Sequence, residues 1–249
     1  METIDNLEEK YDATLKQFEH TDEEYSKLQT ESTINDFKDC IMVLDTETTG
    51  FPEKNGFYSY CDYTDITKYE NARIVQFSWG LYDKTGNLHK LNDKIIKPNG
   101  FTIENPQHHN ITTEIANDLG VDIKEVLVQF SNDLKKTSTI VGHNLMFDEN
   151  VILSELYRLN MLEVINEFKQ KIKNCTGIGT QHLLKIPMNF ESSNPSKKYK
   201  MPTLEELYFW CFDKEIDKTH NSKYDVIHTA ECYFYIKSGK YKNKDENSK

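Results

Sequence analysis

Residues Ile41-Met42-Val43-Leu44-Asp45-Thr46-Glu47-Thr48-Thr49-Gly50 form an apolar run that ends in two carboxylates, three threonines and a glycine. Four consecutive apolar residues are typical of a central strand that is covered on both faces. Asp45 and Glu47 are two residues apart, so their side chains project from the same face of an extended chain. Adjacent carboxylates repel each other unless a cation lies between them, and oxygen ligands favour Mg²⁺ or Mn²⁺. The pattern indicates a buried strand leading to a metal site, although an isolated Asp-x-Glu pair also fits an ordinary acidic turn.

Length and composition favour a soluble intracellular protein. The chain has 249 residues, enough for one large domain or for one domain with an extension. We expect no contact with a membrane, because no apolar run is long enough to cross one and the first residues are acidic rather than a basic signal start. The five cysteines are odd in number, scattered and never spaced as C-x-x-C, which argues against a disulfide framework and against a zinc site.

The net charge of −11 is unevenly distributed along the chain. Residues 1–39 hold 12 Asp and Glu against 4 Lys, a net charge of −8, which leaves −3 for residues 40–249. The main body is therefore nearly neutral, and divalent cations bound to its carboxylates would make it compatible with an anionic partner.

Residues 1–39 are predicted to form an acidic helical extension. Apolar side chains recur every seven residues at Ile4, Tyr11, Phe18 and Tyr25, but Thr14 and Thr21 interrupt the same seam. The sequence Thr21-Asp22-Glu23-Glu24 matches a capping box, so two short helices with a break near His20 fit better than one coiled coil. This segment could pack on its own domain, or it could bind a protein partner or a second copy of the chain.

The order of predicted elements indicates an α/β domain. After a long irregular stretch over residues 51–71, two strand-like runs at 72–82 and 88–97 flank a turn at 83–87 and complete an antiparallel meander with the first strand. Apolar spacing then predicts a helix at 122–136, a short strand that ends at Gly142, and a helix at 145–159. Strand, helix, strand and helix after a meander favour a mixed sheet.

Two further polar clusters follow these elements. Gly142-His143-Asn144 forms a polar turn, and Asp148 lies in the first turn of the helix after it. His220 precedes Asp225 by five residues, and Asp225 opens a helical pattern that continues to Ile236. Taken singly, Asp148 fits ordinary helix-start electrostatics and His220 fits a surface loop.

Together, in this order and on this αβ pattern, the clusters resemble the DEDDh family of 3′→5′ exonucleases. That family includes the proofreading subunit of bacterial DNA polymerase III (DnaQ-like proteins), ribonuclease T, oligoribonuclease and the Trex-type exonucleases. Two further stretches agree with the resemblance: His109-Asn110-Ile111-Thr112, and the Pro-x-Leu-x-Glu-Leu pattern at residues 202–207. It implies a ribonuclease H-like fold with a mixed five-stranded sheet flanked by helices. The resemblance covers residues 41 to about 238, so we expect an exonuclease domain over residues 40–239. Residues 240–249 are expected to be a polar, disordered tail.

The resemblance assigns a role to each site residue. Asp45, Glu47, Asp148 and Asp225 would bind two Mg²⁺ ions, which Mn²⁺ could replace, and His220 would accept the proton of the attacking water. The substrate would be nucleic acid with a free 3′ end, single-stranded or frayed. Its terminal nucleotide would contact Thr46, Thr48, Thr49, Phe51 and Asn144, with Phe51 against the base. His109 and His143 are expected to be structural.

Several alternatives remain open at this stage. A haloacid-dehalogenase-type phosphatase needs Asp as its second acidic residue, where this chain has Glu47. A non-catalytic nucleic-acid-binding module would be expected to lose some of the four carboxylates or the histidine, and all are present. An acidic scaffold would act through residues 1–39. DNA is the expected substrate. RNA remains the alternative, because the same motifs serve both and discrimination depends on contacts to the sugar 2′ position.

Overall fold

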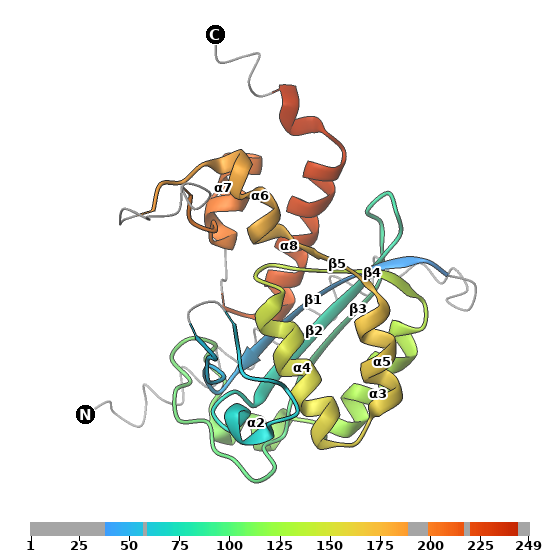
Figure 1. The fold of residues 1–249 in the computed structure, drawn as a ribbon, viewed down its shortest axis with the longest axis vertical. Coiled ribbons are helices and arrows are strands. Elements are labelled where there is room, and N and C mark those ends of the chain that lie inside the picture. Colours follow the sequence, from blue (N-terminus) through green and yellow to red (C-terminus); the bar gives the residue numbers. More distant parts are fainter. Residues whose placement is uncertain (1–37, 57–58, 189–198, 217–219, 244–249) are drawn as a thin grey trace.

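The computed structural model describes residues 38–56, 59–188, 199–216 and 220–243 (Figure 1). The strands are β1 (Cys40–Thr48), β2 (Ile74–Tyr82), β3 (Leu88–Ile95), β4 (Thr137–Gly142) and β5 (Ile172–Cys175). The helices are α2 (Thr113–Leu119), α3 (Ile123–Leu134), α4 (Met146–Arg158), α5 (Leu162–Gln170), α6 (Thr176–Leu184), α7 (Leu204–Phe212) and α8 (Ser222–Lys237). Two short 3₁₀ helices, η2 (Ile66–Tyr69) and η3 (Lys240–Asn243), complete the described elements.

The five strands form one mixed sheet in the order β3-β2-β1-β4-β5. The strand β1 is central: it pairs antiparallel with β2 and parallel with β4. The pair β2–β3 is antiparallel and the pair β4–β5 is parallel. The antiparallel meander and the mixed five-stranded sheet predicted from the sequence are therefore confirmed.

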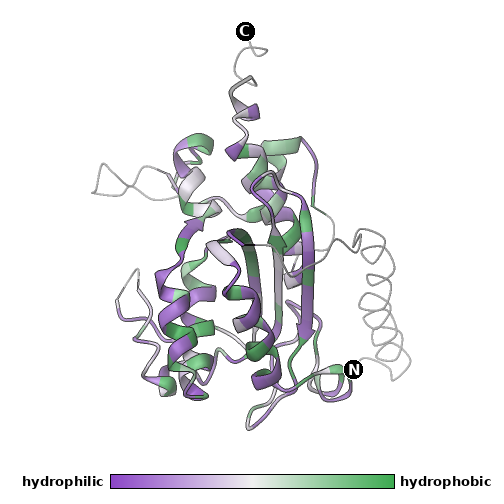
Figure 2. Cartoon of the chain, turned by 90° about the vertical axis from the view of Figure 1, so that its right-hand side faces the viewer, coloured by the Kyte–Doolittle hydropathy of each residue, from purple (hydrophilic) through white to green (hydrophobic). Residues whose placement is uncertain are grey.

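The alternation of side chains along β1 separates the two faces of the sheet. Met42 and Leu44 belong to the larger core, which also contains apolar residues of α3, α4 and α5. Ile41 and Val43 point to the opposite face and pack against Val226 of α8. Figure 1 shows α3, α4 and α5 on one side of the strands and α8 on the other. Figure 2, coloured by hydropathy, shows hydrophobic colour along a central strand between helices that carry both colours.

Several elements differ in extent from their prediction. The strand β4 begins at Thr137, before its apolar residues, because its first residues already pair with β1. The residues of α2, α5, β5 and α6 carried no helix or strand prediction. The irregular stretch 51–71 contains η2, and the expected tail begins with η3, where the Tyr241 ring lies 5.9 Å from that of Trp210. The helices predicted within residues 1–37, and residues 244–249 of the tail, lie outside the described residues.

Within the described part of the chain, no helix has the length and apolar character that crossing a lipid bilayer requires.

Candidate functional site

Three carboxylates meet at the end of β1. Asp45 and Glu47 share the face of β1 that α8 covers, because they alternate in step with Ile41 and Val43. Asp225 lies in the first turn of α8, so the packing of this helix brings it to the same place. One carboxylate oxygen from each of Asp45, Glu47 and Asp225 lies within 4.8 Å of the others. Residues separated by 180 positions in the sequence thus form one acidic cluster.

Asp148 approaches this cluster from the opposite side of β1. It is 2% exposed, in the first turn of α4. Its Oδ1 accepts hydrogen bonds from the backbone N–H of Thr46, at 2.9 Å, and from the Thr46 hydroxyl, at 2.8 Å. Thr46 points to the α4 face because it lies between Asp45 and Glu47 in the strand. The first turn of α4 is thereby fixed to the end of β1.

Burial raises the pKa of all four carboxyl groups, and repulsion by neighbouring acids adds to this effect for Asp45, Glu47 and Asp225. The pKa of Asp45 lies well above its usual value because of burial and the charges of Asp148, Asp225 and Glu47. Burial and the charges of Asp225 and Asp148 raise the pKa of Glu47 to about 8. Burial is also the main reason that the pKa values of Asp148 and Asp225 are about 7. Such a cluster holds protons near neutral pH unless cations replace them.

The donor set fits a hard divalent cation. Asp45, Glu47 and Asp225 each offer one carboxylate oxygen, and these oxygens are close enough together to contact a single ion. Carboxylate oxygens are the ligands that Mg²⁺ and Mn²⁺ prefer. The raised pKa values also indicate a cation site, because a bound cation would stabilise the ionised carboxylates and offset the repulsion between them.

A buried polar network holds the beginning of α8 against the sheet. The Gln76 side chain accepts a hydrogen bond from the Ser222 backbone N–H at 3.3 Å, and its amide donates to Asp93 at 2.8 Å. The hydroxyls of Ser78 and Ser222 are 2.6 Å apart, and the Ser78 hydroxyl also lies 2.9 Å from the Asp93 carboxylate. Gln76, Ser78 and Ser222 are all fully buried. This network sets the position from which α8 directs Asp225 toward Asp45.

This network was not predicted from the sequence, although the sequence contains a signal for it. Gln76 and Ser78 are two residues apart in an otherwise apolar strand, so they share one face. They pair directly with Glu47 and Asp45, respectively. Two polar side chains on one face of a buried strand indicate a polar interior beside the site.

His220 lies at the entrance to α8, on an exposed part of the chain. Its φ of 62° is left-handed, and its backbone N–H donates to the Asp225 carboxylate. Its ring centroid is 6.2 Å from that of His108. The buried His109, whose pKa burial lowers to about 4, lies beside the Thr48 backbone. The backbone contact with Asp225 holds the predicted base next to a predicted metal ligand.

His143 has contacts that suit the structural role predicted for it. Its Nε2 lies 2.9 Å from the Pro202 carbonyl oxygen and its Nδ1 lies 3.0 Å from the Thr176 hydroxyl. A carbonyl only accepts, so Nε2 carries the proton and Nδ1 accepts from the hydroxyl. Burial lowers the pKa of His143, which favours this neutral form. His143 thus ties the turn before α4 to α6 and to the segment before α7.

Among the predicted nucleotide contacts, the three threonines have hydrogen bonds within the protein, whereas Phe51 is exposed to solvent. Thr46 is 5% exposed and both its donors bind Asp148, so it positions that carboxylate instead of facing a substrate. Thr48 donates to the Gly50 carbonyl at 2.6 Å, and the Thr49 hydroxyl accepts from the Arg73 backbone N–H at 3.0 Å. Phe51, by contrast, is 74% exposed.

Asn144, the last of the predicted contacts, lies in the turn between β4 and α4. It is only partly buried, and its φ is 61°. Asn is one of the residues that adopt this left-handed conformation readily. Its carbonyl accepts from the Phe147 N–H at 2.9 Å, which fixes the turn before Asp148.

No protein-family model and no curated protein sequence matches this chain. Solved structures do match. Exonuclease I of E. coli in complex with a dT13 oligonucleotide aligns with a TM-score of 0.60 at 18% identity, over 84% of this chain and 43% of that chain. Its complex with a dA16 oligonucleotide gives 0.59 at 18% identity, over 81% and 41%. The zinc-bound form of the E. coli exonuclease I–ssDNA complex gives 0.57 at 16% identity, again over 81% and 41%.

The fold is ribonuclease H-like. At this level of identity the comparison establishes the fold, as the sequence predicted. The chain spans about two fifths of the length of exonuclease I.

Proposed function

We propose that the protein is a metal-dependent 3′→5′ exonuclease that releases nucleoside monophosphates from single-stranded or frayed DNA ends. The observation that carries the proposal is the convergence of Asp45, Glu47 and Asp225 within 4.8 Å, with Asp148 beside them. This is the constellation that the DEDDh resemblance requires, on a ribonuclease H-like fold. The similarity to exonuclease I structures determined with single-stranded oligonucleotides supports DNA as the substrate.

In this proposal Asp45, Glu47, Asp148 and Asp225 would hold two divalent cations, with Asp45, Glu47 and Asp225 as ligands of the one that activates the water. Bound Mg²⁺ or Mn²⁺ would lower the pKa of the attacking water and neutralise charge on the leaving 3′-oxygen. The chain's own contribution is to orient the carboxylates, through Thr46 on Asp148 and through the Gln76 network on α8.

His220 is the proposed general base. A neutral imidazole can accept the proton of the attacking water. Its exposed position and its backbone bond to Asp225 support the assignment, because the ring can then turn toward a substrate bound at the carboxylates.

The domain organisation is part of the proposal. Residues 40–239 would form the catalytic domain, residues 1–39 an extension that is not needed for hydrolysis, and residues 240–249 a tail. The start of β1 at Cys40 and the end of α8 at Lys237 support these limits.

The polarity of digestion tests the function. With 5′-labelled linear single strands and Mg²⁺, the label should remain on a ladder of products that shorten from the 3′ end. A DNA strand and an RNA strand of the same sequence, compared side by side, identify the substrate sugar. A circular single strand has no end and serves as the matched control. Efficient cutting of the circle would refute the exonuclease assignment.

A further inference from the structure

An aromatic cluster lies directly beside the acidic site. Phe147 immediately precedes Asp148 at the start of α4, so its place relative to the carboxylates is fixed. Two rings meet it edge to face: Phe51, with centroids 5.7 Å apart, and Tyr60, with centroids 6.1 Å apart. Phe51 opens the stretch 51–71, soon after the end of β1, and Tyr60 lies further along the same stretch. Burial, and to a smaller extent the Asp148 charge, raises the pKa of the Tyr60 hydroxyl.

The stretch that carries Tyr60 is held by its own backbone contacts. Cys61, the next residue, donates from its N–H to the Glu53 carbonyl at 3.0 Å. The Cys61 carbonyl accepts from the Tyr69 hydroxyl at 2.6 Å. The Tyr69 side chain is fully buried. These bonds on both sides of Cys61 fix the backbone that presents the Tyr60 ring.

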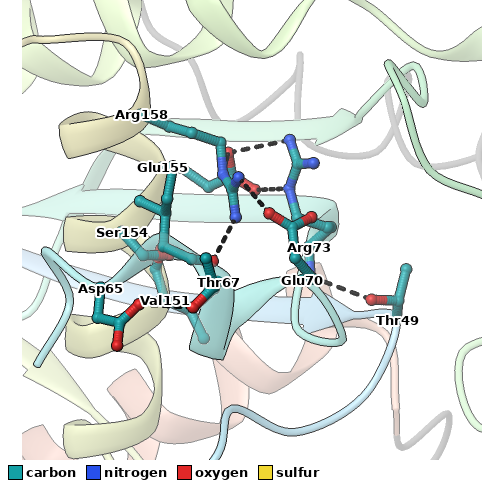
Figure 3. Close-up of polar contacts among 10 residues, drawn as sticks. Thr49, Asp65, Thr67, Glu70, Arg73, Val151, Ser154, Glu155 and Arg158 are labelled. Carbon is teal, nitrogen blue, oxygen red and sulfur yellow. Dashed lines mark hydrogen bonds and ion pairs between the residues drawn. The ribbon is translucent and has the colours of Figure 1, made fainter. Parts of the chain in front are cut away.

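A group of ion pairs anchors the same stretch, and Arg73 just after it, to α4 (Figure 3). Arg158 of α4 lies 2.7 Å from the Glu70 carboxylate and donates to the Ile66 carbonyl at 3.1 Å. Glu155 accepts from the buried Arg73 at 2.7 Å and 3.3 Å. The Arg73 backbone in turn bonds Thr49, two residues before Phe51. These contacts therefore hold the backbone near both Phe51 and Tyr60 in place.

We propose that Tyr60 is a second base-binding side chain, which together with Phe51 and Phe147 forms a surface for the unpaired bases at the 3′ end of the substrate. This inference rests on the proposed function and assigns to the stretch 51–71 a part in substrate binding. The role of Tyr60 is to bind substrate, not to react with it.

The chemistry of the cluster selects a nucleobase as its occupant. Apolar ring faces next to four carboxylates cannot attract an acidic ligand by charge. A flat base can stack on such a ring whatever the sequence of the strand. Phe51 leaves 74% of its surface open for such a contact. The bases of a duplex are already stacked and paired, so the surface favours unpaired ends.

Binding of a fluorescent single-stranded DNA oligonucleotide tests the role of Tyr60. Ca²⁺, a hard cation that carboxylate oxygens bind, replaces Mg²⁺ so that affinity is measured on intact DNA. Each protein is titrated with a normal oligonucleotide and with one that lacks the two 3′-terminal bases but keeps their sugars and phosphates. The variants are Tyr60→Ala, Tyr60→Leu, which keeps apolar packing on Phe147, and Tyr60→Phe, which keeps the ring.

Tyr60→Ala and Tyr60→Leu should weaken binding of the normal oligonucleotide about 5- to 100-fold, the effect of losing one stacked base. On the abasic oligonucleotide both should match the wild type within about twofold, and Tyr60→Phe should match it on both ligands. Tyr63→Ala is the matched control, because the Tyr63 ring belongs to the same stretch but lies against Tyr157. It should leave both affinities unchanged.

Equal losses on the normal and abasic oligonucleotides, or no loss on either, would overturn the role of Tyr60. Hydrolysis is measured separately with Mg²⁺. A wild-type protein that hydrolyses DNA while Tyr60→Ala binds normally would refute only this inference. A wild-type protein that shows the base-dependent loss but no hydrolysis would refute only the exonuclease proposal.

Discussion

Replacing Asp148 by Asn should stabilise the metal-free protein, and the gain should increase with pH. Asp148 is buried, and its pKa is raised to about 7 from an ordinary value of 3.8. A folded-state pKa above the unfolded value means that stability is present at low pH and is lost as the pH rises through 7. Asn stays neutral at every pH, and its carbonyl oxygen can accept the same two hydrogen bonds from Thr46.

The magnitude follows from the size of the shift. About three pKa units at 1.36 kcal/mol each set an upper limit of about 4 kcal/mol for the cost of ionising Asp148 in the metal-free fold. Because the Asn oxygen is a weaker acceptor than a carboxylate, we expect a net gain of about 2–4 kcal/mol at pH 9 and almost none at pH 4. For a domain of this size that corresponds to an increase in Tm of about 5–15 °C.

Urea unfolding in EDTA at pH 4, 7 and 9, followed by circular dichroism, measures the effect. Glu104→Gln, which removes an exposed carboxylate and changes the net charge equally, is the control and should show no pH-dependent gain. With saturating Mn²⁺ the order should reverse, because the wild type then gains more from the cation than the variant does. An Asp148→Asn protein that is no more stable than the wild type at pH 9 in EDTA would refute the account of the buried charge.

Three further predictions address the other parts of the site. His220→Ala should lower the rate of hydrolysis by about 10²–10⁴ while Mn²⁺ affinity, measured by calorimetry, stays within a few-fold; a near-normal rate would exclude His220 as the base. Ser78→Ala should cost about 1–3 kcal/mol of unfolding free energy in urea and weaken Mn²⁺ binding, because the start of α8 loses a buried partner. Ser154→Ala is the control, because the Ser154 hydroxyl donates to the Val151 carbonyl within α4; it should cost stability without weakening Mn²⁺ binding. Equal Mn²⁺ affinities of Ser78→Ala and Ser154→Ala would show that the network does not position Asp225. Deleting residues 1–39 should leave hydrolysis unchanged, since β1 begins at Cys40, and a folded but inactive truncation would assign those residues to the site.

The parts of the fold with clear periodicity were predictable. The strand β1 follows directly from its apolar run, and α3 and α4 from helical spacing. The strand β5 was not located, because its residues Ile172–Cys175 alternate without an apolar face and Ile172 is 63% exposed. Its place in the sheet depends on pairing with β4.

The composition of the site was predictable to a similar degree. Asp45 and Glu47 share a face by strand geometry alone, but the meeting with Asp225 came only from the family resemblance, because tertiary packing of α8 brings them together. The use of both Thr46 donors by Asp148 could not be foreseen from the sequence, since it depends on how α4 docks on β1. The anchoring of stretch 51–71 likewise depends on the pairs Arg73–Glu155 and Glu70–Arg158, whose members lie 82 and 88 residues apart in the chain.

The most direct test of the carboxylate site is the metal dependence of hydrolysis by the wild type and by Asp45→Asn. A 5′-labelled single strand is incubated with each protein in EDTA and then with excess Mg²⁺ or Mn²⁺, and circular dichroism verifies that both proteins are folded. The wild type should be inactive in EDTA and fully active after either cation is added, whereas Asp45→Asn should remain inactive throughout. Undiminished activity in EDTA, or an Asp45→Asn protein as active as the wild type, would contradict a hydrolytic site built on these carboxylates.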